Sequence, residues 1–497
     1  MEYVRFLSRE LFPLTGKRPA KLHDPDLATL AAAGFGLWNP NAGALMLLPL
    51  GLGAADDVCR SFLQGLERTG LQPFPVQSLS ERGPLEFAVR LLKRPGDLPR
   101  LFAERTNDRL TLQGFAEDAG SAADMASCAL RALGQTLAAW GINVRRVERL
   151  TDDGFAVDLG VPADAGEEDG LISPTGSLYA PDSPLAAEPW QEASEEAQDL
   201  ATPNCSTIDE LAAFLSISPK RTVKSMCYTV GGKLAVVICR GDRQIDASKL
   251  KAAFGGAPFA PASDVELRAA LGETAGYIGP AGLPDAVRLL ADFSACECRN
   301  VVIGANRKGY HRTGAEWGRD FKTDWTADVT SVQIGDETPD GPLSACRWRR
   351  LVRVRPIDPA AAGEPSLVTS SAQGKRRIFP WRADVRLTSV LASAAACGKL
   401  ARFVPFDLVL VSDDDVARTQ FVSVLTEQNV RILEDDRPSQ LTARAASCSP
   451  LGLPILTVSG GEAELTFPDG TRRPIGLTEI SDLADLLANS RNQFSSL

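Results

Sequence analysis

The residues best suited to chemistry lie close together between Gly304 and Asp320. This stretch reads GANRKGYHRTGAEWGRD, and its four glycines surround His311, one of only two histidines in the chain. Glycines permit tight backbone turns, which could hold a histidine and a carboxylate for binding or catalysis. The same pattern also fits a β-hairpin whose glycines only serve turns and whose histidine is solvated or hydrogen-bonded locally.

Two earlier segments add polar and glycine-rich positions to this set. They are Arg221-Thr222-Val223-Lys224 and Gly276-Tyr277-Ile278-Gly279-Pro280. Lys224 on its own could be a solvated lysine at the start of a strand. Together with the His311 stretch, the two segments form a recognisable set of motifs.

Five runs of sequence, taken in order, resemble the editing domain inserted into bacterial prolyl-tRNA synthetases. They span Thr202 to Asp324 and read TPNCSTIDELAAFLSI, RTVKSMCY, VVICRGDRQID, GYIGPAGLP and GANRKGYHRTGAEWGRDF. The resemblance implies an ester hydrolase that deacylates tRNA(Pro) mischarged with a smaller amino acid, typically alanine. It also implies a fold shared with free-standing trans-editing deacylases.

The resemblance also assigns site residues. The catalytic residues it implies are Lys224, Gly276, Gly279, Pro280 and His311, where Lys224 is the lysine of the family's TVK motif and Gly276 to Pro280 its GxxxP loop. The substrate-binding residues it implies are Thr222, Met226, Tyr277, Asn306, Gly314 and Asp320. Ester hydrolysis needs a water, a donor to the developing oxyanion and a hold on the terminal adenosine, and the loop amides and Lys224 suit the last two tasks. We expect His311 to shape the amino-acid pocket rather than act as a base, and we expect no metal, cofactor or covalent nucleophile.

The remaining sequence resembles the prolyl-tRNA synthetase itself, but the residues for making prolyl-tRNA are changed. Leu85 and Phe87 stand where the family has a threonine and a glutamate, and Ser389 stands where motif 3 has an arginine. Motif 2 has no counterpart between Arg94 and Phe115. Because charge-stabilising groups each contribute several kcal/mol to an adenylation transition state, we expect no proline–tRNA ligase activity.

The end of the chain resembles the family's anticodon-binding domain, including its Asp435-Asp436-Arg437 segment. Before it lies a basic strip for which tRNA phosphate contacts are predicted, at Arg347, Arg349, Arg350, Arg353, Lys375 and Arg376. A solvated surface strand explains the same arginines equally well.

Composition sets the broad class of the protein. The chain has 497 residues, 44% hydrophobic and 23% charged residues, and a net charge of −10. These values indicate a globular multidomain protein and argue against indiscriminate nucleic-acid binding. Without an apolar run of membrane-spanning length or a signal-peptide pattern, we expect a cytoplasmic protein with no membrane partner.

Composition shifts and hydrophobic periodicity divide the chain into five segments. We predict a degenerate class II synthetase core in two parts, 1–160 and 325–402, an acidic Pro/Ser/Gly-rich connector at 161–201, an editing domain at 202–324, and an anticodon-binding-like domain at 403–497. The fold class is α/β (α+β): an antiparallel-sheet core, an inserted mixed α/β domain, and a carboxy-terminal α/β domain.

Hydrophobic patterns also predict a strand after Ala42, then a helix through Val58, Phe62 and Leu66 that stops at Gly70. They predict a helix from Ser206 to about Leu215, strands at 225–230, 234–240 and 300–304, and alternating helices and parallel strands after Phe403.

Three functions remain open at this point. The favoured hypothesis is a trans-acting aminoacyl-tRNA deacylase for alanyl-tRNA(Pro) or a similar mischarged tRNA. The alternative is a catalytically silent tRNA-binding or regulatory paralogue, and transfer of the aminoacyl group to a metabolite is a third option. The partner is tRNA through its acceptor end, and the family implies a homodimer.

Overall fold

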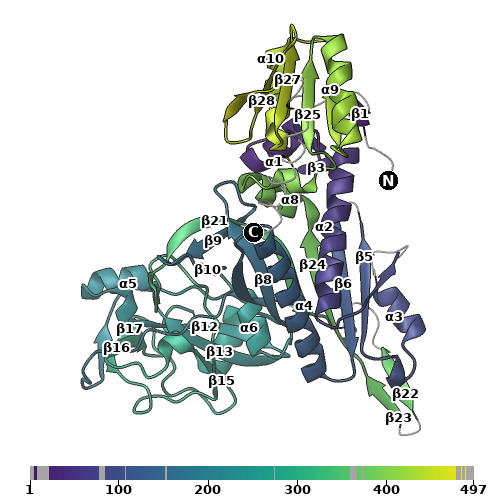
Figure 1. Ribbon diagram of the computed structural model, residues 1–497. Coiled ribbons are helices and arrows are strands. Elements are labelled where there is room, and N and C mark those ends of the chain that lie inside the picture. Colours follow the sequence, from purple (N-terminus) through teal and green to yellow (C-terminus); the bar gives the residue numbers. More distant parts are fainter. Residues whose placement is uncertain are drawn as a thin grey trace. The chain divides into compact units, whose positions relative to one another are not determined.

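The computed structural model covers most of the chain, and Figure 1 shows its ribbon. The structure describes residues 5–7, 22–77, 84–106, 108–151, 154–273, 275–358, 367–371, 374–476, 479, 483 and 487. Contacts divide the chain into two compact units: unit 1 comprises 1–145, 158–168 and 347–497, and unit 2 comprises 146–157 and 169–346. Every helix in the described part of the chain is too short or too polar to cross a lipid bilayer.

A mostly antiparallel sheet forms the core of unit 1. Five neighbouring strands of this sheet are, in spatial order, β21 (Ser344–Pro356), β24 (Phe379–Arg386), β6 (Arg109–Ala116), β5 (Arg100–Arg105) and β4 (Pro73–Val76). The β21–β24, β24–β6 and β6–β5 pairs are antiparallel, whereas β5 and β4 are parallel. This arrangement confirms the predicted fold class for the core.

Two long helices pack along this sheet. Helix α4 (Ala119–Ala139) packs on β6 and β24, and α2 (Pro49–Arg68) packs on α4. Helix α2 begins with Pro49 in its first turn, where a missing N–H costs nothing. It buries apolar residues at helical spacing, and the chain turns at Gly70, whose φ is +86°. The predicted helix and its stop are therefore confirmed.

Shorter elements complete the central part of unit 1. They are α1 (Pro25–Ala32), β2 (Gly36–Asn39), β3 (Ala44–Leu47), α3 (Leu85–Leu91), β22 (Val368–Ser371), β23 (Gly374–Arg377) and α8 (Leu387–Ala396). Strands β2 and β3 form one hairpin, and β22 and β23 form another. The expected strand after Ala42 is β3.

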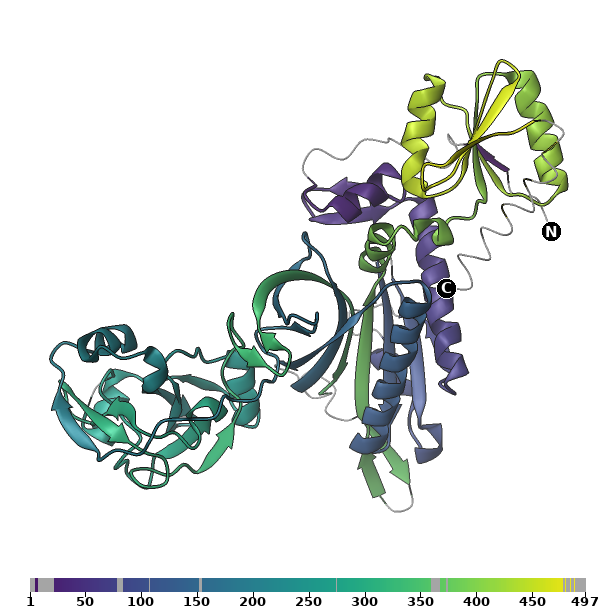
Figure 2. The same cartoon turned by 60° about the vertical axis from the view of Figure 1, so that its left-hand side comes forward.

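The carboxy-terminal part of unit 1 is a second, six-stranded sheet. Its strands, in spatial order, are β1 (Arg5–Leu7), β26 (Ile432–Asp435), β25 (Leu408–Ser412), β27 (Ile455–Ser459), β28 (Glu462–Thr466) and β29 (Arg472–Pro474). Helices α9 (Asp415–Glu427) and α10 (Leu441–Cys448) lie on opposite faces of it (Figure 2). The predicted parallel strands are confirmed. Sequence analysis did not foresee β1, which pairs in parallel with β26, or the antiparallel β28 and β29.

Unit 2 contains the predicted editing block, and the chain enters it through β7 (Arg145–Thr151) and β8 (Gly154–Pro162). One sheet contains, in spatial order, β14 (Phe259–Pro261), β12 (Val223–Val230), β13 (Lys233–Arg240), β15 (Arg288–Asp292) and β18 (Trp325–Ala327). A second, antiparallel sheet contains β11 (Gln198–Ala201), β17 (Tyr310–Ala315) and β16 (Val301–Gly304). The strands expected at 225–230, 234–240 and 300–304 are therefore present.

Three helices accompany these sheets: α5 (Ile208–Leu215), α6 (Ala247–Ala253) and α7 (Asp264–Leu271). Thr207 caps α5, because its hydroxyl accepts from the Glu210 amide while the Glu210 carboxylate accepts from the Thr207 amide. The helix expected after Ser206 and Thr207, ending near Leu215, is thus observed.

Strand pairing extends this block beyond the expected limits of 202 and 324. Strand β11 lies inside the expected connector but pairs with β17, and β18 begins after Asp324 but pairs with β15. The connector also contains β9 (Glu168–Ile172) and β10 (Leu178–Tyr179). Such short strands are hard to predict because their pairing depends on partners far away in the chain.

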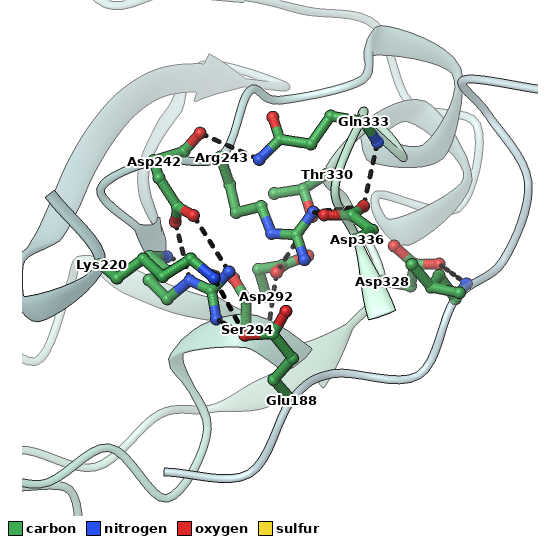
Figure 3. Close-up of polar contacts among 12 residues, drawn as sticks. Glu188, Lys220, Asp242, Arg243, Asp292, Ser294, Asp328, Thr330, Gln333 and Asp336 are labelled. Carbon is green, nitrogen blue, oxygen red and sulfur yellow. Dashed lines mark hydrogen bonds and ion pairs between the residues drawn. The ribbon is translucent and has the colours of Figure 1, made fainter. Parts of the chain in front are cut away.

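Buried ion pairs hold the segment after β18 against the five-stranded sheet of unit 2 (Figure 3). Arg243 Nη1 lies 2.6 Å from both carboxylate oxygens of Asp336, and the two side chains are 5% and 4% exposed. Lys249, which is fully buried, donates to Asp328 at 2.9 Å and to the Thr330 carbonyl. These contacts make residues up to Asp336 part of the same packed block. Strands β19 (Glu337–Thr338) and β20 (Gly341–Pro342) follow it.

Candidate active site

A cavity of about 380 Å³ opens in unit 2 between the start of α5, strand β12 and the ends of β16 and β17. Its wall is formed by Ser206, Thr207, Ile208, Leu211, Val223, Lys224, Ser225, Met226, Cys227, Pro261, Ala262, Leu267, Ala275, Gly276, Ile278, Val302, Gly304 and His311. Four predicted site residues therefore share one cavity: Lys224, Met226, Gly276 and His311. They come from three separate segments of the sequence, which the pairing of the strands brings together.

Lys224 is held at the edge of the cavity by the neighbouring strand. It lies opposite Cys239 on β13, and its Nζ donates to the Gly241 carbonyl at 3.2 Å. The Gly241 amide in turn donates to the Thr222 carbonyl at 2.8 Å. The ammonium group is thus kept at the cavity by a backbone acceptor that carries no neutralising charge.

Thr222, predicted to bind substrate, is fully buried and does not line the cavity. Its hydroxyl donates to the Pro219 carbonyl at 2.8 Å. A methyl group on Gly241 would lie only 1.9 Å from that hydroxyl oxygen. Thr222 therefore supports the backbone that holds Lys224 instead of contacting a ligand in the cavity.

The GxxxP loop packs backbone to backbone against the end of β16. A Cβ atom on Gly279 would lie 1.8 Å from the Gly304 carbonyl oxygen, and one on Gly304 would lie 2.4 Å from the Ile278 carbonyl oxygen. Gly276 has a φ of +100°, which favours glycine. Gly276 lines the cavity, whereas Gly279 and Pro280 lie behind it.

Backbone amides of this loop are candidate oxyanion donors. The Gly279 amide is already engaged, because it donates to Asn306 Oδ1 at 2.8 Å, and Pro280 has no amide hydrogen. Within the described residues, the amides of Gly276 and Ile278 donate no hydrogen bond. Both residues line the cavity, so their amides are the candidate donors to an ester oxygen there.

His311 is buried, with 5% of its surface exposed. Its Nδ1 lies 2.7 Å from Thr202 Oγ1, and its ring packs against Tyr277 with centroids 5.6 Å apart. Burial lowers the pKa of His311 below its ordinary value of 6.5, and a hydrogen bond to the Gly276 backbone opposes this shift only in part. His311 is therefore neutral near pH 7 and joins β17 to the GxxxP loop.

The hairpin interpretation of this stretch is correct for the backbone, because β16 and β17 are antiparallel neighbours. The histidine on it is not solvated, however, and it reaches two other segments of the chain.

Cys227 is the one cavity-lining residue with a thiol. Burial raises its pKa to about 11, so the thiol is protonated and a poor nucleophile at neutral pH. In the described part of the chain, no three His, Cys, Asp or Glu side chains are grouped so as to hold a metal ion. Met226, by contrast, is 41% exposed beside the cavity and is free to contact a ligand there.

The other predicted substrate-binding residues lie outside the cavity wall. Tyr277 is buried behind it, and Asn306 contacts the loop from the far side. At Gly314, with a φ of +67°, a Cβ atom would lie 2.3 Å from the Glu196 carbonyl oxygen. Asp320 accepts from the Glu316 amide at 2.8 Å and pairs with Arg319. Gly314 and Asp320 therefore stabilise the β16–β17 hairpin and its packing against residues of the expected connector.

Half of the predicted basic strip is occupied by ion pairs within unit 1. Arg349 is 1% exposed and pairs with Asp24 at 2.5 Å and Asp26 at 2.8 Å, so the prediction that it contacts phosphate from the surface is wrong. Arg353 pairs with the buried Asp158 at 2.7 Å, and Arg350 pairs with Glu168.

The other three members of the strip, Arg347, Lys375 and Arg376, are exposed. Arg347 donates to the Gly166 carbonyl at 2.8 Å. Lys375 and Arg376 are exposed on β23. The solvated-strand alternative fits Lys375 and Arg376. It does not fit Arg349, Arg350 and Arg353, whose carboxylate partners were not visible in sequence.

Thr202 is the residue of this site that sequence analysis missed. It stands in the TPNCS run that contributed to the resemblance, but a threonine at the end of a connector carries no chemical signal of its own. Its importance follows from its contact with His311, which is 109 residues away.

Comparisons with known proteins agree with this geometry. The family model of the aminoacyl-tRNA editing domain matches residues 202–321. The proline–tRNA ligase of Streptococcus equi subsp. equi (strain 4047) is 36% identical over 178 residues, which cover 35% of this chain and 29% of that protein. That of Lysinibacillus sphaericus (strain C3-41) is 28% identical over 288 residues, covering 55% and 51%. The chain thus spans at most about half the length of these relatives.

Among solved structures, prolyl-tRNA synthetase from Cryptosporidium parvum complexed with halofuginone and AMPPNP aligns over 95% of this chain and 78% of that one. Its TM-score is 0.44 and the sequence identity is 8%.

The fold, the cavity and the family match define an α/β protein with an aminoacyl-tRNA editing domain. Residues 202–321 match the aminoacyl-tRNA editing domain family, and parts of the chain are similar to proline–tRNA ligases.

Proposed function

We propose that this protein is an aminoacyl-tRNA deacylase that hydrolyses the ester of a mischarged tRNA. The observation that supports this most is that Lys224, Gly276 and His311 line one cavity within the matched editing domain. Each comes from a different motif, and all three motifs are intact.

The chemistry is addition of water to the ester carbonyl, followed by departure of the terminal ribose oxygen. The products are the free amino acid and the tRNA hydroxyl. The amides of Gly276 and Ile278 would stabilise the oxyanion, and Lys224 would bind the charged acceptor end or the ester. Because Cys227 is protonated and His311 is buried and neutral, neither serves as nucleophile or strong base, and the substrate's own hydroxyl would assist the water.

The substrate we propose is alanyl-tRNA(Pro) or a similar small aminoacyl-tRNA. The relatives that match are proline–tRNA ligases, which points to tRNA(Pro). Exposed Lys375 and Arg376 on β23 are the basic residues of the strip best suited to phosphate contacts.

We further propose that proline–tRNA ligase activity is absent. Leu85 is 3% exposed within an apolar cluster that includes Phe102, and Phe87 packs on Phe102 with ring centroids 6.4 Å apart. Ser389, at the expected arginine position, is 4% exposed and donates to Glu167 at 3.3 Å. Apolar packing and a small hydroxyl cannot replace a proline-binding carboxylate and an ATP-binding cation.

The test is deacylation of tRNA(Pro) carrying alanine, cysteine or serine by the wild-type chain and Lys224→Ala. We expect hydrolysis that falls at least 10-fold in Lys224→Ala. Lys233→Ala, at an exposed position on β13, is the matched control and should retain wild-type rates. Proline-dependent ATP–pyrophosphate exchange should be undetectable.

Bound tRNA without release of any amino acid would instead support the silent tRNA-binding paralogue. Exchange at the rate of a ligase would contradict the proposed loss of that activity.

A further inference from the structure

Asn306 lies in the turn between β16 and β17, outside the wall of the cavity. Its φ is +52°, in the left-handed region that asparagine enters more readily than most L residues. In this conformation its amide donates to the Tyr277 carbonyl at 2.9 Å. The backbone of Asn306 is therefore joined directly to the GxxxP loop.

Both ends of the Asn306 side chain bind the same loop. Oδ1 accepts from the Gly279 amide at 2.8 Å, and Nδ2 donates to the Ala281 carbonyl at 2.7 Å. These partners determine the orientation of the side-chain amide, because a flipped group would face N–H against N–H and oxygen against oxygen. With its backbone contact, Asn306 holds the loop at positions 277, 279 and 281.

This arrangement decides which loop amides are available to a ligand. The Gly279 amide is used by Asn306, whereas those of Gly276 and Ile278 donate to no group in the described part of the chain. Contact between Gly279 and the Gly304 carbonyl leaves the loop no room to move towards β16. The loop is therefore fixed at Tyr277, Gly279 and Ala281, while Gly276 and Ile278 line the cavity.

We propose that Asn306 is a positioning residue, which holds the loop so that the amides of Gly276 and Ile278 meet the ester oxygen of the bound aminoacyl-tRNA. This inference rests on the proposed deacylase function. It replaces the substrate-binding role predicted for Asn306 from sequence, since both polar ends of the side chain are occupied by the loop.

Two substitutions separate the backbone from the side chain. Asn306→Gly keeps the left-handed conformation without strain and removes both side-chain hydrogen bonds. Asn306→Asp keeps the size of the side chain and the acceptor for Gly279, but sets a carboxylate oxygen against the Ala281 carbonyl. Asn429→Gly is the control, because Asn429 has a φ of +64° at the end of α9 in unit 1.

The experiment measures kcat and KM for hydrolysis of alanyl-tRNA(Pro) by these variants, with thermal unfolding of each. We expect Asn306→Gly to lower kcat about 10- to 100-fold, because small displacements of donors have effects of that size, while KM stays within about twofold. Asn429→Gly should leave both constants unchanged. Loss of folded protein would also lower the apparent kcat at constant KM, so kcat is expressed per folded molecule, from the folded fraction that thermal unfolding gives at the assay temperature. A role in folding alone would leave kcat per folded molecule unchanged.

An unchanged kcat in folded Asn306→Gly would overturn the inference. If that variant does not fold, Asn306→Asp decides the question: a lowered kcat supports the inference and a wild-type kcat overturns it. If the wild-type chain hydrolyses none of the substrates, the proposed function fails, and the positioning role falls with it.

Discussion

Thr202 Oγ1 and His311 Nδ1 lie 2.7 Å apart, and both residues are buried. Pairing of β11 with β17 brings them together, since Ala201 lies opposite Tyr310. A ring N–H of His311 also donates to the Gly276 backbone. The arrangement that satisfies both contacts is a neutral imidazole whose Nδ1 accepts from the Thr202 hydroxyl.

Replacement of Thr202 by valine should therefore affect the site while preserving its shape. Thr202→Val leaves His311 Nδ1 buried without a donor, and such a loss costs about 1–3 kcal/mol. We expect faster hydrogen exchange in β11 and β17 and slower deacylation. Thr202→Ser restores the hydroxyl and should recover most of the activity; equal activity of the two variants would show that the bond is unimportant.

The stability of unit 2 should depend on pH through His311. Because burial lowers its pKa below 6.5, the unfolded chain binds a proton more readily than the folded one as the pH falls past 6.5. The free energy of unfolding should thus be largest above pH 6.5 and should decrease as the pH falls below that value. Denaturant titrations of wild type and His311→Gln between pH 5 and pH 8 measure the effect.

His23 is the control for this measurement, because it is exposed and is the only other histidine in the chain. His23→Gln should retain the wild-type pH dependence. If His311→Gln retains it as well, carboxyl groups rather than His311 cause the loss of stability.

Two glycine substitutions should have opposite effects. Gly279→Ala places Cβ 1.8 Å from the Gly304 carbonyl, a backbone atom that cannot yield without moving the loop, and should destabilise unit 2 by about 1–3 kcal/mol. Gly53→Ala lies on an exposed position of α2 with no atom within 4 Å of the new Cβ. It should stabilise unit 1 by about 0.5–1 kcal/mol. Thermal unfolding of both variants tests the pair.

The buried ion pair of Arg243 and Asp336 offers a test of how unit 2 is held together. Asp336→Asn leaves the guanidinium buried without its counter-charge, and breaking such a pair costs about 3–5 kcal/mol. Asp264→Asn, in the exposed Asp264–Arg268 pair, should have little effect. Urea unfolding followed by hydrogen exchange of residues 325–336 compares them; equal stability would show that surrounding hydrogen bonds hold this segment.

The amino-acid sequence by itself determined the elements whose signals are local. The periodic apolar residues of α2 and the capping residues Thr207 and Glu210 act within a few positions, so they were predictable. The resemblance to the editing-domain family also indicated Lys224, Gly276, Met226 and His311, which line one cavity.

Tertiary structure alone decided which of these groups meet and which are occupied. Strand pairing puts Thr202 on His311, and burial turns Arg349 from a predicted phosphate contact into the partner of Asp24 and Asp26. Asn306 likewise binds the loop instead of a substrate. The physical reason is that burial and hydrogen-bond partners are set by segments far apart in the chain, about which the residues around each position carry no information.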